Sequence, residues 1–408
     1  DVSTSRALAD VFIVDESGSG DFLDIQPAID AAQDGDVLIV RTGVYGGFVV
    51  GDKALQVLAD SGASVRLTGR VAIPHLSRSK QLGVHGLQIQ GTASGDAALD
   101  VDSAQGSIRI RACTLEGWDA PDHSYESGTE GARITSAADI SFDGCVLSGG
   151  DSHQYDYCTD GRDGAPALVA IDSRIAITRS TLNGGRGGDG DKLDGLECWG
   201  CGYSAAGIGG DGALLFSATF LFTSASFFGG GAGGIGWACE SGGGWTICGP
   251  GGDGIDLQQG GSSAKILDCT LVGGAGGGSC GPGQDVRGTD VEFLLGIAKE
   301  IEGQPLVASG TPALVSFVGE PLDAVVLIAS TRSDFLYLPF LRGVLHVGPW
   351  RRTLVIGELD STGQWSTHVH LPNLGAGSEN LTVHLQSVFK NALHERTVSN
   401  PLSATIVH

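Results

Sequence analysis

Five segments of this chain repeat one pattern: an apolar strand, a small residue, then a shorter strand that ends at glycine or just before it. They are RIRACTLEGW (109–118), ISFDGCVLSGG (140–150), IAITRSTLNGG (175–185), FLFTSASFFGG (220–230) and AKILDCTLVGG (264–274). Repeated units of this size indicate a solenoid, in which each unit buries its apolar face only against its neighbours.

Each segment follows another short strand upstream, so that one coil contains three strands and a glycine-rich loop. These strands are ALDVDS (98–103), ARITSA (132–137), ALVAID (167–172), ALLFSA (213–218) and IDLQQG (255–260). The spacing between equivalent small residues varies between 32 and 46 residues, and the loops absorb the difference. Short strands rich in β-branched and aromatic residues, without the helical segment of leucine-rich repeats, predict an all-β right-handed parallel β-helix.

The first 50 residues have a different character. Apolar residues at 25, 28, 29 and 32 predict a short helix that covers the open end of the β-helix, and Val37–Val40 predicts the first strand behind it. This opening resembles the N-terminal cap and first coil of the pectin lyase-like superfamily, especially its pectin methylesterase branch. The resemblance implies the fold and no particular activity, because unrelated functions share this scaffold. The later catalytic motifs of pectin methylesterases and polygalacturonases are missing.

After the glycine-rich loops end near Gly288, apolar strands recur about every ten residues from Ala313 onward. This spacing predicts an antiparallel β-sandwich-like domain. The expected organisation is therefore a β-helix with its N-terminal cap over residues 1–300 and a C-terminal β domain over residues 301–408. The second domain resembles those appended to many secreted bacterial β-helix proteins.

The formal net charge of −23 argues against nucleic acid and against anionic membrane surfaces as partners. No apolar run is long enough to span a bilayer, so membrane insertion is not expected. Such acidity is typical of secreted, extracellular or cell-surface proteins. The chain contains no methionine and no signal peptide, and we interpret it as a mature form.

The nine cysteines fall into two groups. Cys113, Cys145 and Cys269 share one repeat position with Ser180 and Ser226, which predicts a ladder of small residues with buried free thiols. The other six lie in the loops and predict disulfides that link each loop to the next: Cys158 to Cys198 or Cys201, the other of these two to Cys239, and Cys248 to Cys280. Local pairs Cys198–Cys201 and Cys239–Cys248 are the alternative.

Disulfides require an oxidising compartment, in agreement with secretion. A zinc site is the competing interpretation, because Cys198 and Cys201 have finger-like spacing. It is less favoured because no histidine and no second close pair lies nearby.

Acidic residues open successive coils and would stack in a row. We expect each carboxylate to accept hydrogen bonds from the amides of its own turn. Calcium is the alternative at one or two places, since Ca²⁺ takes six to eight oxygen ligands. The candidate calcium ligands are Asp163, Asp189, Asp211 and Asp253.

A polar and aromatic loop cluster, His153, Tyr155, Asp156 and Tyr157, is the candidate ligand-binding site, because aromatic rings stack on sugars. Arginines on the coil strands, Arg109, Arg111, Arg133 and Arg179, are expected to be solvated. The sequence favours a non-catalytic extracellular structural or adhesive protein, with self-assembly through the N-terminal strand or the C-terminal domain as one form of this function. The alternatives are a lyase or hydrolase of acidic glycans and a carbohydrate-binding protein.

Overall fold

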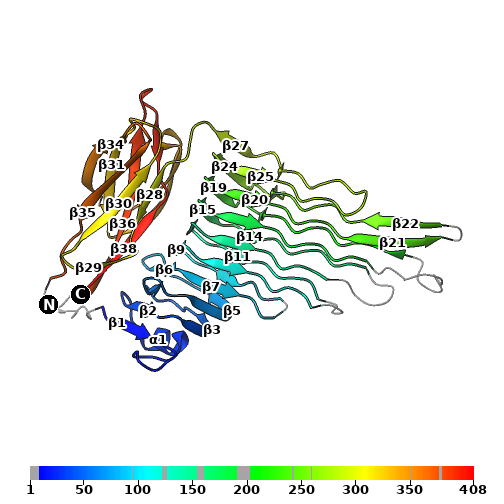
Figure 1. Cartoon of the computed structure of the whole chain (residues 1–408), viewed down its shortest axis with the longest axis horizontal. Coiled ribbons are helices and arrows are strands. Elements are labelled where there is room, and N and C mark those ends of the chain that lie inside the picture. The colour runs from blue at the N-terminus through cyan, green and yellow to red at the C-terminus, as the bar shows by residue number, and fades with distance from the viewer. Residues whose placement is uncertain are drawn as a thin grey trace.

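The computed structural model describes residues 9–93, 95–121, 126–153, 160–190, 203–240, 243–258, 260–349, 351–375 and 379–408. These residues form an all-β parallel β-helix that begins with a capping helix, followed by a C-terminal β domain lying along its side (Figure 1). The predicted fold class is confirmed. No helix among these residues is long and apolar enough to cross a membrane.

One face of the β-helix is a ten-stranded parallel sheet, here called the docking face because the C-terminal domain packs on it. Its strands, in spatial order, are β1 (Val11–Val14), β2 (Val37–Val40), β4 (Gln56–Ala59), β6 (Gln81–His85), β9 (Ser107–Arg111), β12 (Asp139–Asp143), β15 (Arg174–Thr178), β19 (Phe220–Ser224), β24 (Ser263–Leu267) and β27 (Val291–Leu294). The terminal strand β1 pairs in register with β2 of its own chain.

The two other faces join at the long strand β5 (Val65–Ile73), whose first half pairs with β7 and whose second half pairs with β8. The second face continues through β7 (Leu87–Gln90), β10 (Thr114–Glu116), β13 (Val146–Ser148), β16 (Thr181–Asn183), β20 (Phe227–Gly229) and β25 (Thr270–Val272), and β3 (Gly43–Val49) also pairs with β5. The third face contains β8 (Leu99–Asp102), β11 (Ala132–Thr135), β14 (Leu168–Ile171), β18 (Ala213–Phe216), β23 (Ile255–Leu257) and β26 (Val286–Arg287).

A single residue in the left-handed conformation turns the chain from the docking face onto the second face in each coil. These residues directly precede the cysteine and serine ladder, and they are Ala112, Gly144, Arg179, Ala225 and Asp268, with φ between 47° and 62°. Cys113 and Cys145 are buried free thiols and Cys269 is a partly buried one, so the predicted ladder is confirmed. The Ser180 hydroxyl in the ladder accepts from the Cys145 amide at 3.0 Å.

The capping helix α1 (Ile25–Ala31) starts at Asp24, whose side chain accepts a hydrogen bond from the Ile25 amide. Its apolar face, Ile25, Ala28 and Ile29, is buried in the same core as the first coils. The helix therefore shields apolar surface that the first coil would otherwise expose, as the sequence predicts.

The C-terminal domain consists of two packed sheets. One contains β28 (Glu300–Gly303), β30 (Pro312–Val318) and β35 (Gln364–His370). The other contains β29 (Leu306–Ala308), β38 (Leu402–Val407), β36 (Asn380–Lys390), β31 (Ala324–Ser330) and β34 (Arg352–Glu358), with β37 (Arg396–Val398) beside β36. A separate pair, β32 (Ser333–Leu338) and β33 (Gly343–Val347), flanks the short 3₁₀ helix η1 (Pro339–Leu341). All pairings except that of β29 with β38 are antiparallel.

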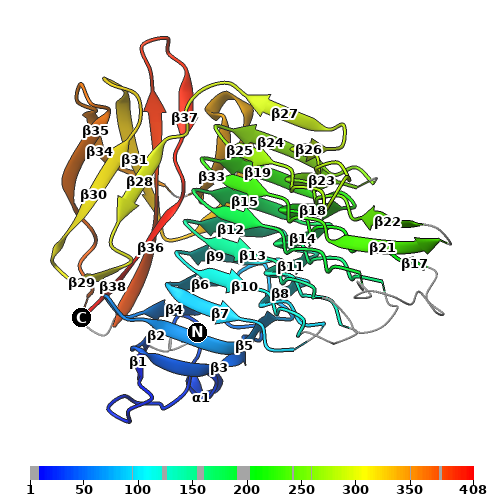
Figure 2. The ribbon, with the colours of Figure 1, turned by 45° about the vertical axis from the view of Figure 1, so that its right-hand side comes forward.

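The C-terminal domain contacts both ends of the docking face (Figures 1 and 2). At the first coil, the Asn380 side chain donates to the carbonyl oxygens of Ala9 and Asp10. Further along, Phe220 and Phe222 pack against Tyr337, with ring centroids 5.3 and 6.2 Å apart. The domain therefore covers a face that would be solvated in an isolated β-helix.

Candidate functional site

The glycine-rich loops form two ordered layers that project from one edge of the β-helix (Figures 1 and 2). We call the two layers together the glycine platform. The outgoing layer consists of residues 149–153, 184–190, 229–235 and 273–277, and the returning layer of residues 128–131, 161–167, 205–212, 249–254 and 281–285. At the outer end, β17 (Tyr203–Ser204), β21 (Ile235–Glu240) and β22 (Gly243–Cys248) form a small antiparallel sheet.

Backbone hydrogen bonds within each layer repeat every third residue. Amides 184, 187 and 190 donate to carbonyls 229, 232 and 235 of the next coil, each at 2.8 Å. Amides 185 and 188 donate across to carbonyls 165 and 162 of the returning layer, also at 2.8 Å. A period of three in an extended chain is the geometry of polyproline II, which has no hydrogen bonds within its own strand.

The bonds between the layers continue as a zigzag across the coils. In each pair the amide of the first residue donates to the carbonyl oxygen of the second, at 2.7 to 3.1 Å. The pairs are Thr129 to Trp118, Gly150 to Thr129, Ala165 to Gly150, Gly185 to Ala165, Gly210 to Gly185, Gly231 to Gly210, Gly252 to Gly231, Gly274 to Gly252 and Gly283 to Gly274. Each coil is therefore tied both to its neighbour and to the opposite layer.

Most buried positions of the platform have no room for a side chain, although Thr129 and Ala165 occupy two of them. A Cβ atom on Gly231 would overlap the carbonyl oxygen of Gly185, and one on Gly210 would overlap that of Ala165. Because backbone atoms of the opposing strand cause the overlap, no side-chain rearrangement relieves it. In segment 184–190, side chains occur only at every third position, at Arg186 and Asp189, where the chain faces outward.

The row of aspartates satisfies the amides that face outward from the platform. One carboxylate oxygen of each accepts from an amide one coil further on, at 2.6 to 2.8 Å. The pairs are Asp119 with Asp151, Asp151 with Arg186, Asp160 with Ala205, Asp163 with Ile208, Asp189 with Ile235, Asp211 with Asp253, and Asp253 with Gln284. The expectation that each carboxylate bonds its own turn was wrong, because the unpaired amides of the lattice lie in the next coil.

Three of the four candidate calcium ligands, Asp163, Asp211 and Asp253, line one groove on the outer surface of the returning layer. The groove has a volume of about 480 Å³ and continues onto the third face at Asp256 and Arg287. The fourth, Asp189, belongs to the outgoing layer and forms an ion pair with Arg186 at 2.9 Å. Among the described residues, no three histidine, cysteine or acidic side chains are grouped so that they could hold a metal ion.

Burial is the main cause that raises the pKa of Asp211 to about 7, and the neighbouring carboxylates of Asp256 and Asp253 raise it further. Burial also raises the pKa of Asp256. One oxygen of the Asp256 carboxylate accepts from Gln258, while its Oδ1 has no hydrogen-bond partner. The groove therefore combines a carboxyl group that is partly protonated near neutral pH with a buried carboxylate that is only partly satisfied.

The structure contains a Cys248–Cys280 disulfide with a Cα–Cα distance of 5.5 Å, the last bridge in the predicted chain of linked loops. It joins two consecutive returning segments, and it is incompatible with the alternative Cys239–Cys248 pair. Cys158, Cys198 and Cys201 lie outside the described residues, and the pairing predicted for Cys239 stays a prediction.

The predicted aromatic loop cluster falls mostly outside the described residues, which include His153 but not Tyr155, Asp156 or Tyr157. His153 is exposed at the end of an outgoing segment, and its Nδ1 lies 2.5 Å from the Ala120 carbonyl oxygen. A ligand site at this cluster therefore stays a prediction.

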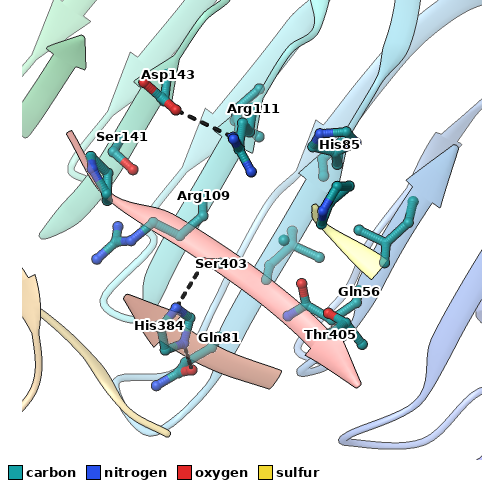
Figure 3. Close-up of a pocket in the computed structure, with 17 residues that line it drawn as sticks. Gln56, Gln81, His85, Arg109, Arg111, Ser141, Asp143, His384, Ser403 and Thr405 are labelled. Carbon is teal, nitrogen blue, oxygen red and sulfur yellow. Dashed lines mark hydrogen bonds and ion pairs between the residues drawn. The ribbon is translucent and has the colours of Figure 1, made fainter. Parts of the chain in front are cut away.

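A second cavity lies between the docking face and the C-terminal domain (Figure 3). Its volume of about 30 Å³ has room for about two water molecules and not for a sugar ring. His384 of the C-terminal domain lies 2.8 Å from the Gln81 side chain of the β-helix, which ties the two domains together. This cavity is part of a domain interface.

The same interface buries the arginines that we expected to be solvated. Arg109 is 8% exposed and makes two bonds, of 2.6 and 2.7 Å, to Asp139. Asp143 pairs with Arg111 at 3.3 Å and with Arg179 at 2.7 Å, and it accepts a bond from Asn400 of the C-terminal domain. The expectation was wrong for these three arginines because the C-terminal domain covers their face, whereas Arg133 is only half-buried beside Glu130.

Comparison with known proteins adds little to this description. No family model and no curated protein matches the chain. Among solved structures, it is similar to the enzymatically active domain of tailspike protein 2 from bacteriophage CBA120, at 10% sequence identity over 98% of this chain and 72% of that one, with a TM-score of 0.24. A likeness this weak carries no argument about function. The structure itself defines the class of the protein, an all-β parallel β-helix with ordered glycine-rich loops.

The sequence contains a local signal for the platform that is separate from the repeated strands. Gly184-Gly-Arg-Gly-Gly-Asp and Gly273-Gly-Ala-Gly-Gly follow a three-residue period over short stretches. The period does not extend over the whole chain, so it does not indicate a collagen-like triple helix, and within single loops it marks the platform.

Proposed function

We propose that this protein is a non-catalytic, extracellular or cell-surface protein of the structural or adhesive kind, whose glycine platform is a rigid recognition surface. The observation that carries the proposal is the hydrogen-bonded order of the platform. A loop that only connects strands needs neither bonds in two directions nor glycine at most of its buried positions. The Cys248–Cys280 disulfide supports an oxidising location outside the cell. The cap and the order of strands support membership of the pectin lyase-like superfamily.

The platform has the spacing to engage a repetitive polymer. Along one segment, outward side chains recur every three residues, which is about 9 Å in polyproline II geometry. Neighbouring coils of a parallel sheet are about 4.8 Å apart. A regular grid of outward groups matches a chain of repeating units such as a polysaccharide, and this is the partner we propose.

Self-assembly is a further part of the proposal and has two candidate surfaces. β1 already pairs with β2 of its own chain, and it is the last strand of its sheet within the described residues, although Asp21 and Phe22 hydrogen-bond to Ile13 along part of its other edge. At the opposite end, Phe293 and Leu295 are 62% and 82% exposed beside the terminal strand β27. Light scattering as a function of concentration tests for association at either end.

The adhesive function is tested by measuring retention of the full chain on a panel of surface polysaccharides, followed by analysis for released fragments. We expect retention without fragments. Ile208 is 45% exposed on the returning layer, so Ile208→Ser should weaken retention several-fold. Val44 is 57% exposed on β3, far from the platform in sequence, and Val44→Ser is the matched control. Equal retention of both variants would contradict a role for the platform.

A polysaccharide-cleaving enzyme is the second candidate, favoured by the raised pKa of Asp211, about 7, in the acidic groove. A carboxyl group protonated near neutrality can donate a proton to a leaving oxygen. Fragments that form in proportion to protein, and that disappear in Asp211→Asn but not in Asp160→Asn, would establish this function in place of the first.

A further inference from the structure

We propose that the groove on the returning layer binds a primary ammonium group of a small organic molecule, with the carboxylate of Asp256 as its main partner. This inference goes beyond the adhesive function and does not rest on it, because polysaccharide retention and ammonium binding can succeed or fail separately.

The charge of the groove selects a cation. Four carboxyl groups line it, those of Asp163, Asp211, Asp253 and Asp256, and they face one guanidinium, that of Arg287. The Arg287 side chain is 59% exposed and lies 3.7 Å from both Asp253 and Asp256. At that distance and exposure it screens the carboxylates only weakly, and it can move into solvent when another cation enters.

Asp256 supplies an unused acceptor at the wall of the groove. Its side chain is 4% exposed and lines the groove, and its Oδ1 is closed to solvent and has no hydrogen-bond partner. A buried carboxylate oxygen without a donor carries a desolvation cost that nothing in the protein offsets. A ligand N–H donor recovers that cost when a small rotation of the Asp256 carboxylate turns this oxygen toward the groove.

The arrangement of the other oxygens favours an ammonium group over a divalent metal. One oxygen each of Asp163, Asp211 and Asp253 already accepts a backbone amide. Ca²⁺ needs six to eight oxygen ligands around one point, and no three acidic side chains in the described part of the chain converge in that way. An ammonium group needs only three acceptors, which a carboxylate and neighbouring carbonyl oxygens can supply.

The apolar side chains that line the groove favour an organic ammonium ion over an inorganic cation. Pro166, Pro250, Pro282 and the exposed side chain of Ile208 line the groove, and its volume of about 480 Å³ is within the range of small-molecule sites. Apolar walls beside a carboxylate bind the carbon frame next to the nitrogen. An inorganic cation would gain nothing from them.

Binding should also release protons near neutral pH. The carboxylates of Asp253 and Asp256 and the guanidinium of Arg287 surround the Asp211 carboxyl, whose pKa is raised to about 7. A cation entering the groove lowers that pKa, so affinity for an alkylamine that stays protonated over this range, such as spermidine, should rise as the pH increases from 6 to 8.

The test is titration calorimetry of the full chain at low ionic strength with three probes: spermidine, the glucosamine trimer and the N-acetylglucosamine trimer. The two trimers share a sugar frame and differ in charge. We expect saturable binding of at least one of the two amines and none of the acetylated trimer. Binding of spermidine alone identifies an alkyl polyamine as the ligand type, and binding of the glucosamine trimer alone identifies an amino sugar.

Two opposite variants locate the site. Asp256→Asn should weaken amine binding about tenfold or more, because it removes a charged acceptor. Arg287→Gln should strengthen binding, because it removes the one competing cation. Asp160→Asn, which carries the same change outside the groove, should leave affinity unchanged.

Several results would overturn the proposal. They are equal binding of the acetylated and free trimers, no saturable amine binding, and unchanged affinity in Arg287→Gln. Displacement of the amine by one equivalent of Ca²⁺, beyond the effect of NaCl at matched ionic strength, would assign the groove to a metal.

Discussion

At the scale of single residues, the packing of the platform depends on glycines at which a single added Cβ atom would overlap the opposing layer. Gly231 and Gly210 have no room for a Cβ atom because a carbonyl oxygen of the opposing layer occupies it. Gly281 lies in the same platform, but a Cβ there would meet nothing within 4 Å. Residue type alone does not distinguish these glycines, and only their neighbours do.

Gly231→Ala should therefore destabilise the protein by about 3 kcal/mol or more, since overpacking against backbone forces the layers apart. Gly281→Ala should change stability by less than about 1 kcal/mol and in the stabilising direction, because alanine restricts the unfolded chain. Urea unfolding followed by circular dichroism measures both. Similar losses in both variants would contradict the packing described for the platform.

The Asp211 carboxyl gives a residue-scale prediction about pH. Its pKa in the folded protein, about 7, is above the ordinary value of 3.8, so the folded state holds this proton more tightly than the unfolded state does. The group therefore lowers stability as the pH rises from about 4 to 7, and the penalty is constant above that range.

Asp211→Asn removes this penalty and keeps an oxygen for the Asp253 amide. The melting temperature of the variant relative to the native protein should rise by a few degrees between pH 4.5 and 7.5. Asp160→Asn is the control and should show no such trend. A difference in melting temperature that is flat with pH would contradict the raised pKa.

At the scale of elements, each coil turns at one left-handed residue between the docking face and the second face. Glycine occupies that position at Gly144 and at Gly86, which joins β6 to β7, while Ala112 and Ala225 adopt φ of 49° and 47° despite their Cβ atoms. A left-handed residue other than glycine costs roughly 1 kcal/mol, so several corners store strain that the neighbouring strands hold in place.

Ala225→Gly should relieve that strain, although the more flexible unfolded chain offsets part of the gain, for a net increase of about 0.5 kcal/mol. Gly144→Ala should do the reverse and cost about 1 kcal/mol. Paired urea titrations measure the two changes, and changes of the same sign would contradict a left-handed corner at both positions.

The elements that could be predicted from the sequence are those with periodic apolar residues. The coil strands, the helix over residues 25–31 and most sandwich strands follow from such patterns. β28, β29 and β37 were not predicted, because they have only three or four residues each and leave little room for a period; the six-residue strands β21, β22 and β32 were not predicted either.

The candidate site was less predictable. Acidic positions can be identified from repeats, which is why Asp163, Asp211 and Asp253 were singled out and now lie in one groove. Asp256 and Arg287 were not singled out, because their meeting depends on the register between β23 and β26. Arg109 is buried because it contacts Ser333 and Asp334 of the C-terminal domain, which are 224 and 225 residues further along the chain. No local sequence pattern contains information about such a contact.

At the scale of the whole molecule, a buried polar interface joins the two structural parts. His384 and His346 lie in it with pKa values lowered to about 3, mainly by burial and then by the Arg109 guanidinium. Burial, with the Arg111 charge, lowers the pKa of His85 to about 4. All three rings are therefore neutral in the folded protein at neutral pH.

Because the folded pKa values lie below the ordinary value of 6.5, the stability that these rings contribute is complete above pH 6.5 and is lost as the pH falls toward 4. The melting temperature should fall over this range, and proteolysis between residues 295 and 305 should accelerate. His384→Gln keeps polar contacts but does not titrate, so it should reduce the acid sensitivity. An unchanged pH profile in this variant would exclude His384 as a contributor.

The glycine-rich loops form an ordered, hydrogen-bonded platform. Hydrogen–deuterium exchange of the full chain, read by mass spectrometry over peptides spanning 184–190, 205–212 and 249–254, tests this order. We predict exchange on the order of a thousandfold slower than in an unstructured chain, comparable to that of the β-helix strands. Complete exchange within seconds, with the strands still protected, would show that the loops are unstructured and would contradict the account.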